Sequence, residues 1–296
     1  MTSVASDVLI IGCGDIGERV ALRELADGRA VTGLVRTEAS ALRLRALGIK
    51  PLLCDLDSAS ALAPLSVKDA RVYYFAPPPG KGLTDPRMES LVSRMTPANR
   101  PRRVVLISTT GVYGDCQGEW VTEDRPPAPQ ADRAKRRLAA ETSLRRWSES
   151  SGVPVVILRV PGIYARGRLP EARLRNGEPV LREEESPFSN RIHADDLADV
   201  CVVAAHHPAP GVVYNVSDGH PTTMTDFFYR VADLLALPRP PAITLEAARQ
   251  QMNEGMLSYL AESKRIDNRR LREELGVELR YPDLTSGLRA CLASPD

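Results

Sequence analysis

The segment that most constrains the fold is a glycine-rich turn close to the N-terminus. An apolar run at residues 8–11 is followed directly by Gly12-Cys13-Gly14-Asp15-Ile16-Gly17, and apolar residues then recur with helical spacing up to Leu25. This order predicts a strand, a tight turn and a helix. One glycine permits the turn, the second lets the backbone approach a pyrophosphate, and the third lets the helix pack on the strand. The segment therefore predicts a dinucleotide site whose phosphates lie at the helix N-terminus.

Composition is that of an ordinary globular protein. The 296 residues, 43% of them hydrophobic, suffice for one large core or two moderate ones. The N-terminus lacks the features of a signal peptide, and no run approaches the roughly 18 apolar residues of a membrane span, so we expect a cytoplasmic protein that does not engage a membrane. The five cysteines lie far apart and form no CxxC pair, which predicts neither a disulfide framework nor a metal site.

The charge pattern argues against a nucleic-acid partner. The net charge is +1, although basic residues cluster at 100–103, 135–137, 145–146 and 269–272. Acidic residues interleave with these clusters and no aromatic residues alternate with them. We therefore interpret the clusters as solvated helix faces and expect a small-molecule substrate.

Strand-like and helix-like segments alternate along the chain. Short runs rich in β-branched residues predict strands at 8–11, 30–35, 50–54, 72–76, 104–108, 155–160 and 212–215. Helical spacing predicts helices at 16–26, 39–46, 86–95, 133–150, 194–205 and 225–235. The alternation predicts an α/β fold of the Rossmann type, a doubly wound parallel sheet with a smaller C-terminal substrate lobe. Such a sheet binds its ligands at the carboxyl ends of its strands.

The end of the second predicted strand discriminates between the two nicotinamide cofactors. An NAD site usually places a carboxylate there to bond the ribose 2′-hydroxyl, whereas an arginine accommodates a 2′-phosphate. This chain has Arg36 and Thr37 at that point and no carboxylate at the strand end. We therefore expect NADP, with NAD as the alternative. A solvated surface arginine would give the same sequence.

Two further strand ends carry candidate cofactor contacts. Asp55 follows the third predicted strand and could bond an adenine amine. Ala76, Pro77 and Pro78 follow the fourth and could form a rigid surface beneath the nicotinamide ribose. Either segment could equally be loop punctuation.

From the fifth predicted strand onward the chain resembles a known family. That strand ends in Ser108-Thr109-Thr110-Gly111-Val112-Tyr113-Gly114, and three more segments match in order. They are Leu158-Arg159-Val160-Pro161-Gly162-Ile163-Tyr164, Asn190-Arg191-Ile192-His193-Ala194-Asp195-Asp196-Leu197-Ala198 and Tyr214-Asn215-Val216-Ser217-Asp218-Gly219. Together they are similar to the NAD(P)-dependent epimerase/dehydratase family, extended and atypical members of the short-chain dehydrogenase/reductase superfamily. The resemblance implies cofactor contacts from Gly12, Gly14, Asp15, Ile16, Gly17 and Pro161.

The same resemblance implies a catalytic Ser/Thr and a YxxxK pair, in which the tyrosine exchanges a proton with the substrate. Thr109 matches the Ser/Thr position. Lys135 is preceded four residues earlier by Ala131, so the usual tyrosine is absent. Aligning on Glu141 instead places Arg133 and Arg137 at the two positions.

Other residues are candidates to complete the chemistry. Asp85 is the candidate for the aspartate that atypical members carry, although a helix N-cap before Pro86 would by itself account for it. Tyr113 is a candidate for the missing acid or base, and Tyr164, Arg168 and His193 are candidates for substrate binding. Buried tyrosine rings with bonded hydroxyls and a histidine bonded to a backbone carbonyl are the structural alternatives.

The resemblance also implies a division of the chain. We expect a nucleotide-binding domain at residues 1–164, completed by 190–217, and a smaller substrate lobe at 165–189 and 218–296. We expect a monomer or a homodimer.

Two functions of different classes fit the sequence. The first is an NADP-dependent epimerase, dehydratase or reductase that acts on a sugar-like or other hydroxyl or carbonyl substrate. The second is a non-catalytic sensor of NADP(H), suggested by the missing tyrosine. Thr109 and Lys135 favour the enzyme.

Overall fold

The computed structural model describes residues 7–58, 65–207 and 211–292. Within them the chain forms two compact units. Unit 1 takes in the described residues of 1–112, 132–159 and 197–214, and unit 2 takes in those of 113–131, 160–196 and 215–296. The chain therefore enters unit 2 through three separate segments.

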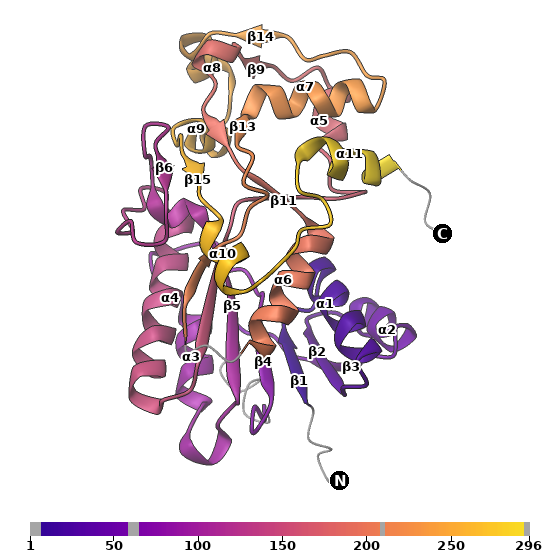
Figure 1. Ribbon diagram of the computed structural model, residues 1–296, viewed down its shortest axis with the longest axis vertical. Helices are drawn as coiled ribbons and strands as arrows, with labels where there is room; N and C mark the ends of the chain where they lie inside the picture. The colour runs from indigo at the N-terminus through magenta and orange to yellow at the C-terminus, as the bar shows by residue number, and fades with distance from the viewer. Residues whose placement is uncertain (1–6, 59–64, 208–210, 293–296) are drawn as a thin grey trace. The chain divides into compact units, whose positions relative to one another are not determined.

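Unit 1 is built on a seven-stranded sheet with the order β12-β7-β5-β4-β1-β2-β3 (Figure 1). Its strands are β1 (Val8–Ile11), β2 (Val31–Val35), β3 (Lys50–Leu53), β4 (Arg71–Tyr74), β5 (Arg103–Thr109), β7 (Val155–Val160) and β12 (Val213–Asn215). β1 pairs in parallel with both β2 and β4, so the strand order reverses beside the glycine-rich turn. This reversal is the usual ligand position of a doubly wound sheet.

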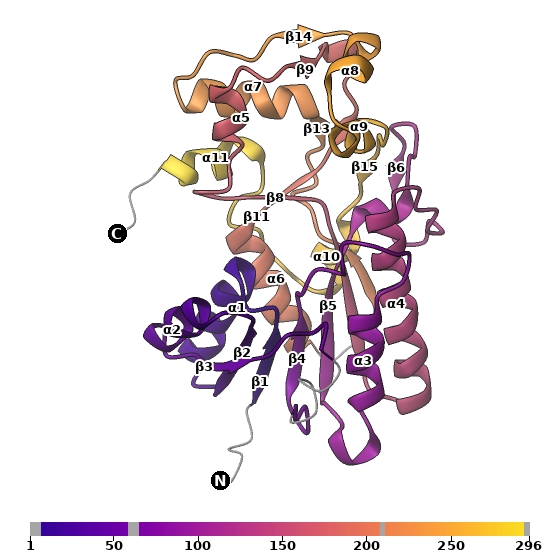
Figure 2. The same cartoon turned by 180° about the vertical axis from the view of Figure 1, so that it is seen from behind.

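Helices cover both faces of this sheet. They are α1 (Asp15–Ala26), α2 (Glu38–Ala46), α3 (Pro86–Arg94), α4 (Asp132–Ser151) and α6 (Ala194–His206), with short 3-10 turns η1 (Pro97–Asn99) and η2 (Thr110–Tyr113). α3 and α4 lie together on one face, and α6 lies with α1 on the other (Figure 2). An ion pair between Arg23 and Asp199 and a contact between Glu24 and His206 hold α1 against α6. The sheet is thus buried on both sides, which explains its continuous apolar strands.

The core of unit 1 fills the space between the sheet and the α3–α4 layer. It contains buried residues of the strands, such as Leu9, Tyr74 and Leu106, together with Met88 of α3 and Leu144 of α4. The ends of the predicted strands and helices in this unit agree with the observed ones to within two residues. The hydrophobic pattern of the sequence was sufficient because the strands are continuously apolar and the helices bury apolar residues against the sheet.

Unit 2 consists of short elements. Its strands form four two-stranded sheets, β10-β13, β11-β8, β14-β9 and β15-β6. These strands are β6 (Trp120–Val121), β8 (Gly162–Tyr164), β9 (Val180–Leu181), β10 (Phe188–Ser189), β11 (Arg191–His193), β13 (Thr222–Thr223), β14 (Ala242–Ile243) and β15 (Arg265–Ile266). The helices are α5 (Glu171–Arg175), α7 (Met224–Leu234), α8 (Leu245–Gln251), α9 (Glu254–Leu260), α10 (Arg269–Glu274) and α11 (Leu284–Leu292), with a 3-10 turn η3 (Glu183–Glu185).

The core of unit 2 lies around α7 and α11. Phe227, Phe228 and Val231 of α7 pack with Leu288 of α11, and Tyr164 joins them from β8. The expected division of the chain assigns residues 113–131 to the nucleotide-binding domain, whereas they cluster here with unit 2. β6 of this segment pairs with β15, which lies about 145 residues later, and a sequence reading of local patterns does not reveal such a pairing.

Candidate functional site

The three glycines of the N-terminal turn have three different surroundings. Gly12 has φ +86°, and a Cβ there would lie 2.5 Å from the backbone nitrogen of Ala76, so only glycine fits. Gly14 has no atom within 4 Å of its ideal Cβ position, which leaves its backbone open to a ligand. A Cβ at Gly17 would lie 3.1 Å from the Ile10 side chain, where α1 packs on β1. The turn thus presents the free N–H groups of the α1 N-terminus at the strand end.

A hollow of about 360 Å³ lies beside this turn, with all its lining residues in unit 1. Six of the predicted cofactor residues line it, namely Gly12, Gly14, Arg36, Thr37, Ala76 and Pro77. Eight residues that were not predicted from the sequence line it as well, namely Cys13, Leu34, Val35, Ser40, Arg43, Leu56, Phe75 and Arg87. The predicted residues Asp15, Ile16, Gly17, Asp55 and Pro78 do not line it. No carboxylate is among the lining residues of this hollow in the described part of the chain.

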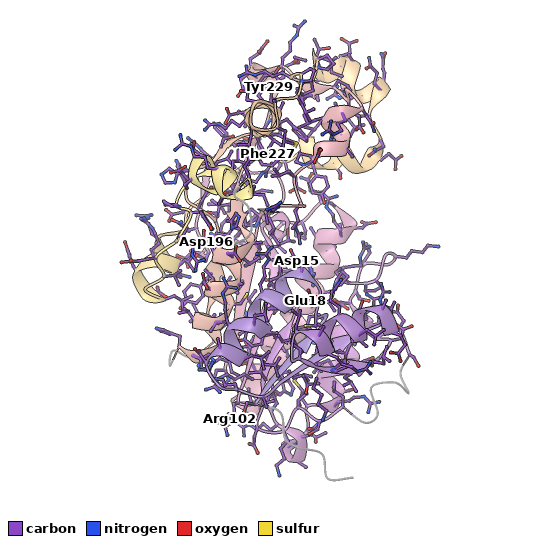
Figure 3. All side chains as sticks on the ribbon, turned by 90° about the vertical axis from the view of Figure 1, so that its right-hand side faces the viewer. Asp15, Glu18, Arg102, Asp196, Phe227 and Tyr229 are labelled. Carbon is purple, nitrogen blue, oxygen red and sulfur yellow. The ribbon has the colours of Figure 1, made fainter. Side chains whose placement is uncertain are left out.

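The end of β2 brings a cation and two hydroxyl groups to the hollow. Thr37 caps α2, since its Oγ1 accepts a hydrogen bond from the backbone N–H of Ser40 and donates one to Ser40 Oγ at 2.9 Å. Arg43 is balanced by Glu18, whose Oε1 accepts from Arg43 Nε at 2.8 Å. Glu18 and Asp15 both project from α1 (Figure 3). Arg36 is exposed and forms neither an ion pair nor a hydrogen bond with the described residues, so its charge is available to an anion.

The opposite edge of the hollow is formed by Arg87 of α3. Its guanidinium binds both carboxylate oxygens of Asp57 at 2.6 and 2.5 Å and donates to the carbonyl of Pro77 at 2.7 Å. The pairing with Arg87 lowers the pKa of Asp57. Asp55, the predicted adenine contact, accepts from the backbone N–H of Asp57 at 3.0 Å, which is the geometry of an Asx turn.

The predicted catalytic residues do not share one environment. Thr109 ends β5, and its Oγ1 accepts from the Gly111 N–H at 3.1 Å. Lys135 lies in the first turn of α4, where its ammonium pairs with Asp132 at 3.1 Å. Tyr113 belongs to unit 2, is 1% exposed, and donates its hydroxyl proton to Asn215 Oδ1 at 2.7 Å. Tyr113 therefore has a buried ring and a bonded hydroxyl, which is the structural alternative to an acid–base role.

Arg137, unlike Lys135, contacts the segment that follows the end of β4. Its Nη1 donates to the carbonyl of Ala76 at 3.0 Å, the residue against which Gly12 packs. One helical turn later, Glu141 is buried and forms an ion pair with Arg159 at 2.8 Å. The alignment on Glu141 places Arg137 at the lysine position. In that alignment the cation of α4 contacts Ala76, a lining residue of the hollow.

Arg137 also belongs to a buried polar group that we call the Tyr74 centre, made of Tyr74, Asp85 and Arg137. Asp85 caps α3, since its Oδ1 accepts from the Met88 N–H at 3.1 Å, and Pro86 holds the first helical position. The capping interpretation of Asp85 is thus confirmed. Its Oδ2 and the Tyr74 hydroxyl are both buried without a hydrogen-bond partner. Burial raises the pKa of Asp85 and of Tyr74 and lowers the pKa of Arg137.

The predicted substrate residues lie in unit 2. Tyr164 ends β8 and is 1% exposed, with its hydroxyl buried and unpartnered. His193 ends β11, accepts at Nδ1 from the Asp195 N–H at 3.3 Å, and packs edge-on against the Tyr164 ring. Arg168 is exposed in the loop after β8. Pro161, the predicted cofactor contact between β7 and β8, also falls in unit 2. All four residues thus lie in unit 2, and their functional roles remain predictions.

A second buried polar group, which we call the Tyr164 centre, is made of Tyr164, Arg191 and Asp218. Asp218 is 4% exposed, and its Oδ2 has no hydrogen-bond partner, like the Tyr164 hydroxyl. Burial raises the pKa of Asp218 to about 7 and lowers the pKa of Arg191 to about 10. The Arg191 guanidinium lies over the Phe227 ring at 4.1 Å. Neither Arg191 nor Asp218 was predicted individually as a site residue from the sequence.

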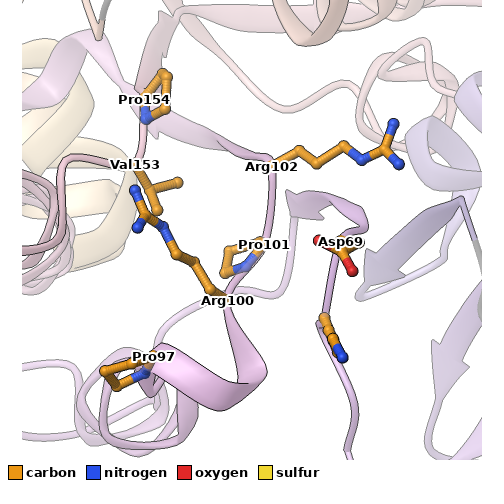
Figure 4. Close-up of a pocket in the computed structure, with 8 residues that line it drawn as sticks. Asp69, Pro97, Arg100, Pro101, Arg102, Val153 and Pro154 are labelled. Carbon is orange, nitrogen blue, oxygen red and sulfur yellow. The ribbon is translucent and has the colours of Figure 1, made fainter.

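A different hollow of unit 1, of about 400 Å³, lies at the amino ends of β4, β5 and β7. Arg100 and Arg102 line it from either side of Pro101, with their side chains pointing apart (Figure 4). Arg103 turns inward at the start of β5, is 8% exposed, and donates to the carbonyl of Ala204. The expectation of a solvated helix face is wrong for this cluster, because it lies in a loop and at a strand start.

Among the described residues no group of three or more His, Cys, Asp or Glu side chains is placed to hold a metal ion. Within the same residues no helix combines the length and apolarity needed to cross a membrane. All five cysteines are free and buried.

Comparisons with known proteins agree with this geometry. A model of the NAD(P)H-binding family matches residues 12–208. Protein YeeZ of Escherichia coli K12 is 30% identical over 286 residues, covering 93% of this chain and 96% of YeeZ. The structure of a functionally unknown conserved protein from Silicibacter pomeroyi is 31% identical, with a TM-score of 0.83 and coverage of 97% and 98% of the two chains. The dTDP-glucose 4,6-dehydratase of Bacillus anthracis in complex with NAD shares the fold, at 16% identity, a TM-score of 0.76 and coverage of 97% and 95%.

The fold and the glycine turn define an NAD(P)-binding protein of the Rossmann type, and the solved structures that share this fold include a UDP-glucose 4-epimerase and a dTDP-glucose 4,6-dehydratase. The chain belongs to the NAD(P)H-binding family.

Proposed function

We propose that this protein is an NADP-dependent enzyme of the epimerase/dehydratase type that acts on a sugar-like or other hydroxyl or carbonyl substrate. The observation that carries the cofactor preference is the end of β2, where Arg36, Thr37 and Ser40 line the hollow and no lining residue is a carboxylate. A guanidinium and two hydroxyls suit the three oxygens of a 2′-phosphate. A site without a carboxylate at this point lacks the group that usually bonds the ribose 2′-hydroxyl of NAD.

The residues present fit the cofactor. The backbone of Gly12 and Gly14 would receive the pyrophosphate at the α1 N-terminus, and the end of β2 would receive the adenosine half. Once bound, a nicotinamide supplies the hydride chemistry of the reaction. We assign to Arg137 the role of holding the ribose of the nicotinamide half. Its guanidinium donates a hydrogen bond to the carbonyl of Ala76, the residue that packs against Gly12. Thr109, at the next strand end, is the proposed residue that orients the substrate.

The cofactor preference is tested by thermal stabilisation and by titration. We expect NADPH to raise the melting temperature more than NADH at equal concentration, since only a ligand of the native state stabilises it. Arg36→Ala should weaken NADPH binding about tenfold or more, because a charge-assisted hydrogen bond contributes about 1.5–3 kcal/mol, and should leave NADH binding unchanged. Arg45→Ala is the matched control, an exposed arginine of the following helix α2 whose nearest partner is Glu38 at 3.8 Å. Equal stabilisation by both nucleotides would remove the preference.

One observation favours a second function, a non-catalytic sensor of NADP(H). Lys135 forms an ion pair with Asp132, and the hydroxyl of the buried Tyr113 is bonded to Asn215, so both of these predicted catalytic residues are engaged in structural contacts. The sensor proposal predicts NADPH binding without oxidation in the presence of any member of a nucleotide-sugar and carbonyl panel. A single turned-over substrate would eliminate it.

A further inference from the structure

The amino ends of three strands of the unit 1 sheet border a hollow that the proposed function does not use. It is the hollow of about 400 Å³ whose lining residues precede β4, β5 and β7. The dinucleotide hollow lies at the carboxyl ends of β2 and β4, and the two hollows share no lining residue. A doubly wound sheet binds its cofactor at the carboxyl ends of its strands, so the cofactor does not account for the residues gathered at the amino ends.

Three cationic side chains line this hollow. Lys68, Arg100 and Arg102 are exposed, and their side chains form neither an ion pair nor a hydrogen bond with any described residue. Among the described residues that line the hollow, Asp69 supplies the one carboxylate. Three cations and one carboxylate leave a charge of +2 at this hollow, although the net charge of the whole chain is only +1. The hollow therefore attracts an anion more strongly than the average surface of the protein does.

The backbone that carries these charges is fixed by hydrogen bonds. The N–H of Asp69 donates to the carbonyl of Arg100 at 2.8 Å, and the N–H of Arg102 donates to the carbonyl of Ala70 at 2.9 Å. These two bonds join the turn before β4 to the segment before β5. Pro101 separates the two arginines, and a proline restricts its own backbone and that of the residue before it. The positions from which the two guanidiniums extend are thus defined before a ligand binds, which lowers the entropy cost of binding.

The two guanidiniums lie on different sides of the hollow. Arg100 Nη2 lies 3.7 Å from the ideal Cβ position at Gly152, beside the segment that precedes β7. Arg102 points away from Val153 of that segment (Figure 4). A guanidinium can bind the oxygens of a phosphate in a bidentate manner. Two guanidiniums that point apart therefore suit two separate phosphoryl groups better than a single one.

The rest of the lining is apolar and contains no aromatic ring. It consists of Pro97, Pro101, Val153 and Pro154. A nucleotide base would find no side chain on which to stack, so the lining favours a ligand without a base. The volume of the hollow lies within the range of small-molecule sites, about 300–1,000 Å³.

We propose that this hollow binds a metabolite with two phosphoryl groups separated by a carbon skeleton, with one phosphate paired with Arg100 and the other with Arg102. Lys68 adds a third cation to the field that the ligand meets. The proposal goes beyond the proposed function and does not rest on it, because the dinucleotide hollow contributes none of these residues.

Calorimetry on the full-length protein tests the proposal, with fructose 1,6-bisphosphate as the probe. The titration is made at about 0.15 M salt, where weak attraction between exposed charges is screened. We expect saturable binding. Fructose 6-phosphate has one phosphoryl group and should bind about tenfold more weakly. Pyrophosphate, whose two phosphates are adjacent, should also bind more weakly than the probe, although its charge is more concentrated.

The same titration with and without saturating NADPH separates the two hollows. We expect the affinity for the probe to be equal in both cases. Loss of probe binding only in the presence of NADPH would place the probe in the dinucleotide hollow and overturn the inference. Failure of NADPH to bind would count against the proposed function alone.

Substitutions of the lining residues test the geometry. Arg100→Gln and Arg102→Gln should each weaken binding of the probe about fivefold, a typical effect for an exposed charge pair. Arg249→Gln is the matched control and should have no effect, because it removes the same charge from an exposed position on α8 that does not line the hollow. Asp69→Asn should strengthen binding about twofold to fivefold, since it removes the carboxylate, and asparagine tolerates the φ of +59° at this position.

Four results would overturn the inference. They are equal binding of fructose 1,6-bisphosphate and fructose 6-phosphate, unchanged affinity of both arginine variants, binding of pyrophosphate as tight as that of the probe, and displacement of the probe by single-stranded RNA at equal phosphate concentration. The last result would indicate a surface for polyanions in general.

Discussion

The Tyr74 centre of unit 1 and the Tyr164 centre of unit 2 contain the same three residue types in different settings. Each joins a tyrosine hydroxyl and an aspartate oxygen that are buried without partners to an arginine whose pKa is lowered by burial. In unit 1 the arginine extends to Ala76, a lining residue of the dinucleotide hollow. In unit 2 the arginine lies over the Phe227 ring inside the unit. The first centre borders a candidate ligand site, and the second borders packed aromatic rings.

The difference teaches where an unpartnered buried polar atom is informative. Such atoms are rare in native proteins, and each one calls for a functional or a structural reason. Beside a ligand hollow, buried donors and acceptors without partners can form hydrogen bonds with a bound molecule. Inside a packed core, the same atoms mainly lower the stability of the fold and make that stability depend on pH. Substitutions in the two centres test this contrast.

The largest expected effect concerns Asp218 in the Tyr164 centre. Burial raises its pKa from 3.8 to about 7, so between these values the unfolded chain loses the proton before the folded protein does. The contribution of Asp218 to stability therefore falls as pH rises through this window and levels off above pH 7. Asp218→Asn removes the titrating group, and its stability relative to the parent should rise by up to roughly 4 kcal/mol from the acid to the alkaline end of the window.

Urea unfolding of parent and variant at several pH values measures this difference. Asp283→Asn is a control of opposite sign, because the backbone N–H of Ser286 lowers the pKa of Asp283, so its contribution is lost as pH falls. A difference between parent and Asp218→Asn that does not change with pH would mean that the pKa of Asp218 is the same in the folded and the unfolded protein.

The next effect concerns the close packing of the Tyr164 hydroxyl against α11. A Cβ at Gly287 would lie 1.9 Å from Tyr164 Oη, so Gly287→Ala should lower the free energy of unfolding by about 2 kcal/mol through overpacking. Tyr164→Phe alone should be neutral or slightly stabilising, since it removes an unpartnered buried hydroxyl. The double variant should recover part of the loss. Gly80→Ala, where the added Cβ meets nothing within 4 Å, should change little. Additive losses in the double variant would show that the hydroxyl does not limit packing.

The sequence predicted unit 1 well and unit 2 poorly for a physical reason. The strands and helices of unit 1 have one or two buried faces and therefore a clear period, and the glycine turn carries its own stereochemistry. The strands of unit 2 span two or three residues and pair with distant segments, so they leave no periodic signal. Site residues that come directly after a strand end, such as Arg36, could be predicted from the sequence. Arg87 was missed because it reaches the hollow from a helix that begins far along the chain.

The choice between two alignments of α4 shows a further limit of sequence reasoning. Lys135 has the expected chemical type, whereas Arg137 has the position that reaches the hollow. Two residues along a helix differ by about 200° in direction, so a shift of that size decides whether a side chain faces the sheet or the solvent. Only the contact with Ala76 distinguishes the two residues.

The smallest expected effect tests that distinction and, with it, the role of the Tyr74 centre as a ligand-facing group. Arg137→Ala should weaken NADPH binding about tenfold, equivalent to about 1.4 kcal/mol, because the proposed ribose contact is lost. Binding of 2′,5′-ADP should be unchanged, since that fragment lacks the nicotinamide half, whereas Arg36→Ala should weaken both ligands. Lys135→Ala should affect neither, because an exposed ion pair contributes at most about 1 kcal/mol to stability and this one lies away from the hollow. Equal weakening of NADPH and the fragment by Arg137→Ala, measured by calorimetry, would indicate that Arg137 only supports the fold, and the Tyr74 centre would then be a structural group like its counterpart in unit 2.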